Sequence, residues 1–220
     1  MYVIVVGAGD IGIQVIDILV EAESDIVVIE SDQHVAEQVS QQYDCLVLKA
    51  DATVKETLVD AGADRADAII TTTEVDATNM MTLMIAQELE IPSLVSTVQN
   101  PDHMSLFRKI GANALQNPQQ LIAEYLVRAV QRPSIKDFMH LKGDAEVFEI
   151  SVSSGAPIAE LTIEEANERG LIGDSLLIVA IERDDGILTP RGDTVIQGDD
   201  LVTVFSREGA TASVVEEFSG

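Results

Sequence analysis

Short apolar runs alternate along residues 1–116 with stretches in which apolar positions recur every three or four residues. The runs are rich in valine and isoleucine, which is typical of buried strands, and the periodic stretches predict amphipathic helices. This alternation favours βαβ units and a parallel sheet. Thr53 and Glu56 are expected to form a capping box for the helix after the third strand. The predicted strands are residues 2–6, 26–29, 45–48, 66–70, 94–98 and 114–115.

A longer helical pattern runs from Pro118 to Pro133, and a shorter helical stretch is expected over residues 135–141. The parallel sheet is complete before this point, so the helix has apolar surface left over. Two placements fit the spacing equally well. The helix is either a crossover that packs on another subunit or a terminal helix folded back on its own sheet.

The pattern changes beyond Gly143, where short alternating runs predict strands joined by turns. The expected strands are residues 147–152, 176–181, 187–188 and 201–205, with a short helix near 163–169. We therefore predict an α/β fold, with a Rossmann-like doubly wound parallel sheet plus crossover helix in residues 1–141. A small α+β C-terminal domain is predicted to follow in residues 142–220.

The loop after the first predicted strand carries the strongest chemical signal. Gly7, Gly9 and Gly12 have G-x-G-x-x-G spacing between a strand and a helix. Gly7 allows a tight turn, Gly9 lets the backbone approach a pyrophosphate, and Gly12 lets the helix pack close to the strand. The N–H groups and the positive dipole end of the following helix then form an anion site.

An acidic residue, Glu30, ends the second predicted strand at about the 20-residue separation from the glycines that dinucleotide-binding folds use. A carboxylate there is placed to hold both hydroxyl groups of an adenosine ribose, and it would repel the 2′-phosphate of NADP. The alternative is a glycine turn beside an acidic surface residue. The order of strand, loop, helix, strand and acid favours the dinucleotide site.

Composition excludes several classes of protein. The chain has 38 acidic residues against 13 lysines and arginines, a net charge of −25, which argues against binding nucleic acid. No apolar run approaches the ~20 residues that cross a bilayer, and no signal peptide is expected before the first strand, so we expect a cytoplasmic protein. The acidic excess is typical of a halophile, with an acidic mesophilic protein as the alternative.

Residues 1–141 resemble the N-terminal domain of the regulator of K⁺ conductance (RCK/KTN) family, the nucleotide-sensing subunits of Trk and Ktr type potassium uptake systems. Residues 142–220 are similar to that family's C-terminal (TrkA-C) domain, so the resemblance covers nearly the whole chain. The matching stretches are residues 7–12, 28–30, 50–53, 61–63, 66–68 and 111–112 in the first part, and 156–158, 178–186, 190–193 and 197–202 in the second.

The resemblance implies a nucleotide site at the carboxyl ends of the parallel strands. Glu30 would hold the adenosine ribose, and Asp51 and Ala52 would border the adenine. The phosphates would be held by Gly7, Ala8, Gly9, Asp10, Ile11 and Gly12. Thr71, Thr72 and Thr73 would lie over the second half of the nucleotide, and Thr97, Val98 and Gln99 would line the same cleft.

Two departures from the family pattern bear on the ligand. Many relatives have an arginine between the second and third glycines, where this chain has Asp10, and often another near the end of the fifth strand, where it has Ser96-Thr97-Val98. An acid near a terminal phosphate is repulsive. The two losses favour NAD or NADH over ATP, with ADP or AMP as alternatives.

The function implied is that of a cytosolic gating subunit, peripheral to the membrane, which passes a nucleotide-driven change to a membrane-embedded potassium transporter. The family also implies homodimers that assemble into a larger oligomer, and no insertion into the membrane. A nucleotide sensor for a different cation or solute transporter is one alternative.

An NAD-dependent oxidoreductase is the other alternative function. Hydride transfer needs a positioned acid or base. None of the three tyrosines is followed four residues later by a lysine, and the three histidines lie apart without metal-ligand spacing. We therefore expect neither catalytic residues nor a metal site.

Overall fold

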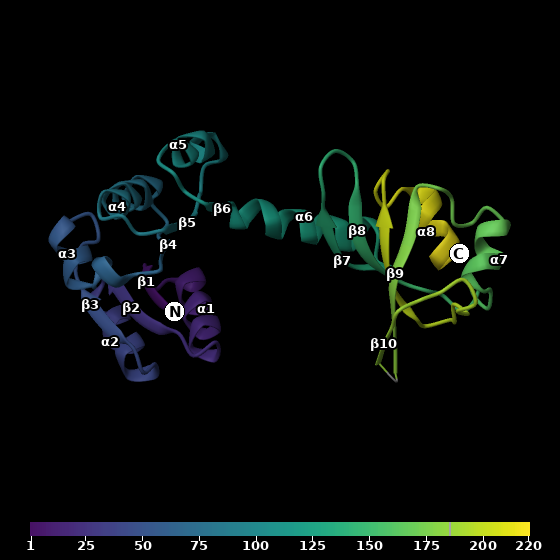
Figure 1. The fold of residues 1–220 in the computed structure, drawn as a ribbon, viewed down its shortest axis with the longest axis horizontal. Coiled ribbons are helices and arrows are strands. Elements are labelled where there is room, and N and C mark those ends of the chain that lie inside the picture. The colour runs from purple at the N-terminus through teal and green to yellow at the C-terminus, as the bar shows by residue number, and fades with distance from the viewer. Residues whose placement is uncertain (185) are drawn as a thin grey trace. The chain divides into compact units, whose positions relative to one another are not determined.

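Six apolar strands of the N-terminal half form one parallel sheet in the order β3-β2-β1-β4-β5-β6 (Figure 1). The computed structural model describes residues 1–184 and 186–220, and the side chains of residues 114–116 lie outside that description. The strands are β1 (Tyr2–Val6), β2 (Asp25–Glu30), β3 (Leu46–Lys49), β4 (Ala68–Thr71), β5 (Ser93–Thr97) and β6 (Ala114–Gln116).

Helices cover both faces of this sheet because alternate residues of its central strands point to opposite sides. Ile4 of β1 lies in one buried cluster with Leu58 and Leu83, and Val5 lies in the other with Ile16. The helices of this half are α1 (Asp10–Glu21), α2 (Gln33–Gln42), α3 (Lys55–Asp60), η1 (Ala63–Arg65), α4 (Asp76–Glu88), η2 (Pro101–His103), α5 (Met104–Lys109) and α6 (Pro118–Gln131).

The strand order reverses direction beside β1. The chain moves outward from β1 to β2 and β3, then returns to pair β4 with the other side of β1 and continues to β5 and β6. In open α/β sheets, ligands bind outside the carboxyl ends of the strands at such a switch point. The topology therefore directs attention to the loops that follow β1, β2, β3 and β4.

An antiparallel sheet in the order β10-β9-β11-β8-β7 forms the second half. One face of it buries Phe148, Ile150 and Val204 in a cluster that also holds Phe218. Its elements are β7 (Ile135–His140), β8 (Glu146–Ser151), α7 (Ile163–Glu168), β9 (Leu176–Arg183), β10 (Gly186–Leu188), β11 (Leu201–Ser206) and α8 (Ala212–Ser219). The predicted fold class, a Rossmann-like parallel sheet followed by an α+β domain, is confirmed.

The chain divides into two compact units, residues 1–122 and 123–220, so that α6 begins in the first and ends in the second. The predicted division between functional domains at residues 141 and 142 stays a prediction. The helix expected over residues 135–141 is wrong, because that stretch is the edge strand β7 paired with β8. The C-terminal helix α8 was not predicted.

A polar and aromatic cluster within residues 123–220 explains why this stretch is a strand. Arg128 of α6 binds both carboxylate oxygens of Glu146, at 2.8 and 3.2 Å, and lies 3.7 Å from the ring centroid of Phe138 on β7. Tyr125 contacts Phe138 and donates a hydrogen bond to Asp137. Burial raises the pKa of Glu146, but hydrogen bonds from Arg128 and the N–H of Ala210, with the charges of Arg128 and His140, outweigh it, so the pKa lies below its usual range.

The capping box expected at Thr53 is also wrong. The N-cap of α3 is Val54, which makes no side-chain capping bond, while the hydroxyl and the backbone N–H of Thr53 both donate to Oδ1 of Asp51, at 2.7 and 2.8 Å. The carboxylate of Asp51 therefore accepts the hydrogen bond of the Thr53 hydroxyl, which does not cap α3. The C-terminal unit contains a capping box that was not predicted, between Thr162 and Glu165 of α7.

Candidate functional site

A cleft of about 470 Å³ lies at the carboxyl ends of β1, β2, β3 and β4. This volume falls within the ~300–1,000 Å³ typical of small-molecule sites. Its lining residues are Val6, Gly7, Gly9, Ile29, Glu30, Ser31, Ala50, Asp51, Ala52, Thr72, Thr73, Glu74 and Thr78.

The glycine loop after β1 has a different constraint at each glycine. Gly7 has φ of +89°, in the left-handed region that favours glycine. A Cβ at Gly12 would lie 2.0 Å from the carbonyl oxygen of Gly7, so only glycine lets α1 approach the loop so closely. At Gly9, in contrast, a Cβ would meet no protein atom within 4 Å. The space over Gly9 is therefore open to the cleft.

The start of α1 offers backbone donors to that space. Gly9 is the N-cap and supplies no side-chain hydrogen bond, so the first N–H groups of the helix have no side-chain partner. The dipole of the 12-residue helix adds partial positive charge at the same point. Asp10 is exposed in the first turn. The arrangement suits an anion that approaches the backbone, with an acidic side chain at its edge.

Glu30 is held in place by the backbone of two neighbouring loops. Its Oε2 accepts a hydrogen bond from the N–H of Ala8 at 2.7 Å, and its Oε1 accepts one from the N–H of Asp32 at 2.8 Å. These bonds tie the end of β2 to the glycine loop and orient the carboxylate at the cleft wall. Oε1 also accepts the hydroxyl of Ser31 at 3.3 Å, whereas Oε2 retains lone-pair capacity for a further donor, such as a ribose hydroxyl group.

Asp51 lines the cleft from the loop that follows β3. Hydrogen bonds from the hydroxyl and backbone N–H of Thr53 lower the pKa of its carboxyl against a smaller opposing effect of burial. Both bonds go to Oδ1. Oδ2 therefore keeps its capacity to accept a hydrogen bond from a ligand, and the carboxylate stays ionised at neutral pH.

Threonines after β4 join the glycine loop to α4. The buried hydroxyl of Thr72 donates to the carbonyl of Gly7 at 2.9 Å, which braces the loop from the side of β4. Thr73 donates through its hydroxyl to Oδ1 of Asn79 at 2.7 Å, and the amide of Asn79 donates back to the carbonyl of Thr73 at 2.9 Å. The wall formed by Thr72 and Thr73 is thus fixed from both sides.

The structure brings together seven of the predicted site residues in the cleft, namely Gly7, Gly9, Glu30, Asp51, Ala52, Thr72 and Thr73. Ala8, Asp10, Ile11 and Gly12 belong to the loop and the helix start but do not line it. Thr71, Thr97 and Val98 are buried, with Thr71 donating to Ser96 at 2.8 Å, and neither they nor Gln99 line the cleft.

Several lining residues were not predicted, including Ser31, Ala50, Glu74 and Thr78. Three of them are immediate neighbours of predicted residues: Ser31 follows Glu30, Ala50 precedes Asp51, and Glu74 follows Thr73. Sequence spacing locates a strand end only to within a residue or two, so such neighbours escape it. Thr78 lies on α4, and no motif in the sequence marks it.

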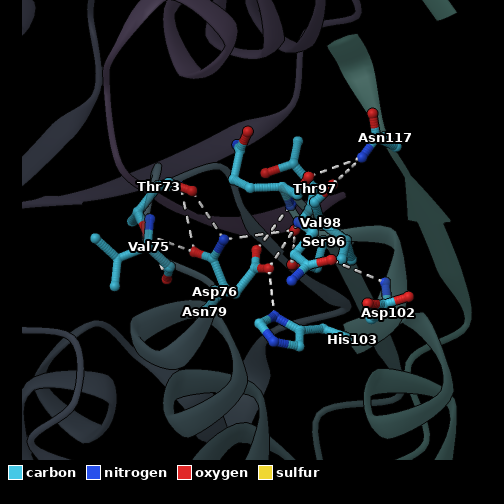
Figure 2. Close-up of polar contacts among 12 residues, drawn as sticks. Thr73, Val75, Asp76, Asn79, Ser96, Thr97, Val98, Asp102, His103 and Asn117 are labelled. Atoms are coloured by element: carbon cyan, nitrogen blue, oxygen red, sulfur yellow. Dashed lines mark hydrogen bonds and ion pairs between the residues drawn. The ribbon is translucent and has the colours of Figure 1, made fainter. Parts of the chain in front are cut away.

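A second polar cluster surrounds Asp76, the first residue of α4 (Figure 2). Its Oδ1 accepts the N–H of Gln99 at 2.8 Å, and its Oδ2 accepts the N–H of Asn100 at 3.0 Å and lies 2.7 Å from Nδ1 of His103. Burial raises the pKa of Asp76, but these backbone bonds and His103 outweigh it and hold the pKa below its usual range. The carboxylate therefore anchors the loop after β5.

The same loop is tied to the start of α6 by Asn117. Its amide Nδ2 donates to the carbonyls of Val98 and Gln99, at 3.0 and 2.9 Å (Figure 2). Its Oδ1 accepts the N–H of Gln120 at 2.8 Å. The side chain thus caps α6 and binds the loop after β5 at once. Hydrogen bonds therefore run from Thr73 at the cleft wall, through Asn79 and the α4 terminus, to α6.

Across residues 1–184 and 186–220, no group of three or more His, Cys, Asp or Glu side chains is arranged to hold a metal ion. Within the same described part of the chain, no helix has both the length and the apolar character needed to span a bilayer.

Both halves of the chain match known domain families. The TrkA-N domain matches residues 3–118, and the TrkA-C domain matches residues 147–219. The chain belongs to the TrkA (RCK) family. The predicted family resemblance is thereby confirmed over nearly the whole length.

Relatives in the TrkA family extend over the full chain. A "Trk system potassium uptake protein TrkA homolog" of Methanothermobacter thermautotrophicus is 27% identical over 221 residues and covers 100% of both chains. A protein of the same name from Pyrococcus abyssi is 27% identical, over 97% of this chain and 96% of its own. The "Trk system potassium uptake protein TrkA" of Vibrio alginolyticus is 26% identical over 99% of this chain, which spans 49% of that relative.

Solved structures with the same fold include the GsuK channel bound to NAD, with a TM-score of 0.70 at 22% identity. It covers 97% of this TrkA-family chain, which spans 38% of the GsuK chain. A structure of GsuK bound to ADP aligns over 60% of this chain with a TM-score of 0.55 and 22% identity. At these identities the likeness establishes the fold.

Proposed function

We propose that the chain is a cytosolic nucleotide-sensing subunit of a membrane potassium transporter, and that it binds NAD or NADH in the cleft after β1–β4. The open space over Gly9 carries the proposal. The local backbone and packing explain why Gly7 and Gly12 are glycines. At Gly9, a Cβ would have no protein atom within 4 Å, so packing does not explain why this position is a glycine. Close approach of a pyrophosphate to the backbone supplies the reason.

The proposed contacts follow the cleft from strand to strand. Glu30 accepts hydrogen bonds from the adenosine ribose, Asp51 and Ala52 border the adenine, and the N–H groups at the start of α1 bind the pyrophosphate. Thr72 and Thr73 form the wall beside the second half of the dinucleotide. The names of two fold relatives, GsuK bound to NAD and GsuK bound to ADP, support an adenine nucleotide.

Charge favours a dinucleotide over ATP. Glu30, Asp51 and Glu74 line the cleft, and none of its lining residues, all of them among those described, is Lys, Arg or His. A triphosphate would bring more negative charge to this acidic site without a cation to neutralise it. ADP and AMP, with fewer phosphates than ATP, remain alternatives.

The hydrogen bonds described above supply a route for the signal. Hydrogen bonds join Thr73 at the cleft wall to Asn79 of α4, Asp76 of the same helix to the loop after β5, and that loop to Asn117 at the cap of α6. We propose that dinucleotide binding shifts these contacts and moves α6, which belongs to the nucleotide-binding domain of residues 1–141. Residues 142–220 would act as the regulatory C-terminal domain. Couplings of this kind typically amount to about 1–3 kcal/mol.

Exposed apolar residues on α6 support assembly into homodimers and a higher oligomer. Ile122, Leu126 and Val130, spaced four residues apart on one helix face, are 60%, 65% and 83% exposed. A second copy that covers this face would bury them, in line with the crossover placement. The acidic excess that points to a halophile stays a prediction.

The competing function is that of an NAD-dependent oxidoreductase. Among the described lining residues of the cleft, its candidate acids and bases are the carboxylates of Glu30, Asp51 and Glu74. The names of full-length relatives favour the transporter regulator. A sensor for a different transporter would use the same cleft. Co-purification of the full chain with a membrane potassium transporter would favour the regulator, and turnover of NADH with a carbonyl compound would favour the enzyme.

Calorimetric titration of the purified full chain with NAD, NADH, ADP and ATP at equal ionic strength tests the ligand. We expect micromolar binding of NAD or NADH and weaker binding of ATP. Tighter binding of ATP than of both dinucleotides would contradict the charge argument. Failure of all four to bind would contradict the proposal as a whole.

A further inference from the structure

We propose that Glu74 makes the cleft select the oxidised dinucleotide, NAD, over its reduced form, NADH. The carboxylate would interact with the positively charged nicotinamide ring, which becomes neutral on reduction. This inference rests on the proposed function, because it takes a nicotinamide dinucleotide as the occupant of the cleft. It assigns a redox preference to one residue, Glu74, which lies outside the glycine motif.

The position of Glu74 follows from the order of the strands. Glu30 and Asp51 line the cleft from β2 and β3, on one side of the glycine loop after β1. Glu74 lines it from the other side, after β4. A dinucleotide with its adenosine ribose on Glu30 and its pyrophosphate over Gly9 must extend its second half toward β4. That half ends in the nicotinamide.

The side chain of Glu74 is available while its backbone is fixed. On one side Thr73 is bonded to Asn79, and on the other the N–H of Val75 donates to the hydroxyl of Thr73 at 3.4 Å. Glu74 itself is exposed, and within the described part of the chain no hydrogen bond or ion pair involves its carboxylate. In contrast, the carboxylates of Glu30 and Asp51 already accept backbone N–H groups.

Reduction changes only one end of the ligand. NAD and NADH share the adenosine, both riboses and the pyrophosphate, so contacts with Glu30, Asp51 and the start of α1 contribute equally to both. The charge of the nicotinamide ring is the difference that the protein can read. No Lys, Arg or His among the lining residues neutralises Glu74. A carboxylate about 4–6 Å from the ring in a water-like dielectric would favour NAD by about three- to sixfold.

Calorimetric titration of the full chain with NAD, NADH and ADP at low ionic strength tests the inference. We expect NAD to bind about three- to sixfold more tightly than NADH in the wild type. Glu74→Gln should bring the two affinities together while leaving that of ADP, which has no nicotinamide, unchanged. Glu21→Gln, which removes the same charge from the exposed end of α1 outside the cleft, should keep the preference.

The outcomes separate the two proposals. If none of the ligands binds, the proposed nucleotide site fails. If NAD and NADH bind equally, or NADH binds more tightly, the redox preference is wrong while the nucleotide site stands. Retention of the preference in a folded Glu74→Gln variant, or an equal change in ADP affinity, would also overturn the role of Glu74. Since the pair is exposed, the preference should shrink in 0.5 M salt, where the screening length is only about 4 Å.

Discussion

Gly9 and Gly12 allow alanine variants that separate packing from ligand binding. At Gly12 the new methyl group would lie 2.0 Å from the carbonyl oxygen of Gly7 and 2.9 Å from the hydroxyl of Thr72. The first of these atoms is backbone, so α1 must move away from the loop. Overpacking of this kind typically costs about 1–3 kcal/mol, and we expect Gly12→Ala to lose about 3 kcal/mol of stability together with nucleotide binding.

At Gly9 the same substitution meets no protein atom within 4 Å, and φ of −70° suits alanine. Alanine restricts the unfolded chain, which stabilises by about 0.4–1 kcal/mol. It is also a poorer N-cap than glycine, which costs about as much. The two effects offset, so the free energy of unfolding should change by less than ~1 kcal/mol and Tm by no more than ~4 °C.

The methyl group at Gly9 instead fills the space assigned to the pyrophosphate. We expect Gly9→Ala to bind NAD at least about tenfold more weakly, from the usual cost of a steric overlap. The assay combines thermal unfolding by circular dichroism with calorimetric titration of NAD for the wild type and both variants. Wild-type NAD affinity in a well-folded Gly9→Ala protein would refute the reasoning.

Four further variants test other contacts. Glu30→Ala removes the acceptor proposed for the ribose and should weaken NAD binding by about ten- to a hundredfold in calorimetry. Asn117→Ala removes the cap of α6 and should lower the free energy of unfolding in urea by about 1 kcal/mol. Because Asn117 does not line the cleft, the variant should keep wild-type NAD affinity. Asp76 has a lowered folded pKa, so it stabilises above its ordinary pKa of about 3.9, and this stability is lost as pH falls toward the folded value. Asp76→Asn should therefore cost about 1–3 kcal/mol at pH 7 and less below pH ~3.5, and a pH-independent difference would contradict the linkage. Arg128→Ala removes the bidentate partner of the buried carboxylate of Glu146 and leaves it His140, at 3.0 Å, and the N–H of Ala210. It should therefore cost about 3 kcal/mol, the lower end for a broken buried pair, whereas a loss under 1 kcal/mol would show that the ion pair contributes little.

The parallel sheet and the glycine loop could be predicted because their signals are local. Each strand from β1 to β5 is a short apolar run, and the three glycines follow the first of them directly. Gly62, which follows the C-cap of α3, has φ of +77°, a conformation for which glycine is the usual residue after a helix. Local periodicity and backbone geometry sufficed for these features without knowledge of tertiary contacts.

Elements that depend on distant partners could not be predicted in the same way. Residues 135–141 place apolar side chains at helical spacing, yet they form an edge strand because β8 pairs with them and Phe138 packs under Arg128. Tertiary contacts override local propensity at such sites. Thr53 and Glu56 fit a capping box by spacing, but Asp51 competes for the threonine.

The candidate site shows the same division. Glu30 was predicted from its distance to the glycines, and its carboxylate lies in the cleft, bonded to the glycine loop. Thr97 was expected in the cleft, but it is 7% exposed and its carbonyl accepts hydrogen bonds from Ser96 and Asn79. Sequence alone does not say which residues at the end of a strand face the ligand. In the structure Glu74, after β4, lines the cleft, whereas Thr97, at the end of β5, does not.

A crystal structure of the full chain grown with NAD would test the central claim most directly. We expect density for an adenosine whose ribose hydroxyls donate to the carboxylate of Glu30, and for a pyrophosphate over Gly9 bonded to the first N–H groups of α1. A cleft filled by the protein's own side chains, or NAD bound with Glu30 turned away from the ribose, would contradict it.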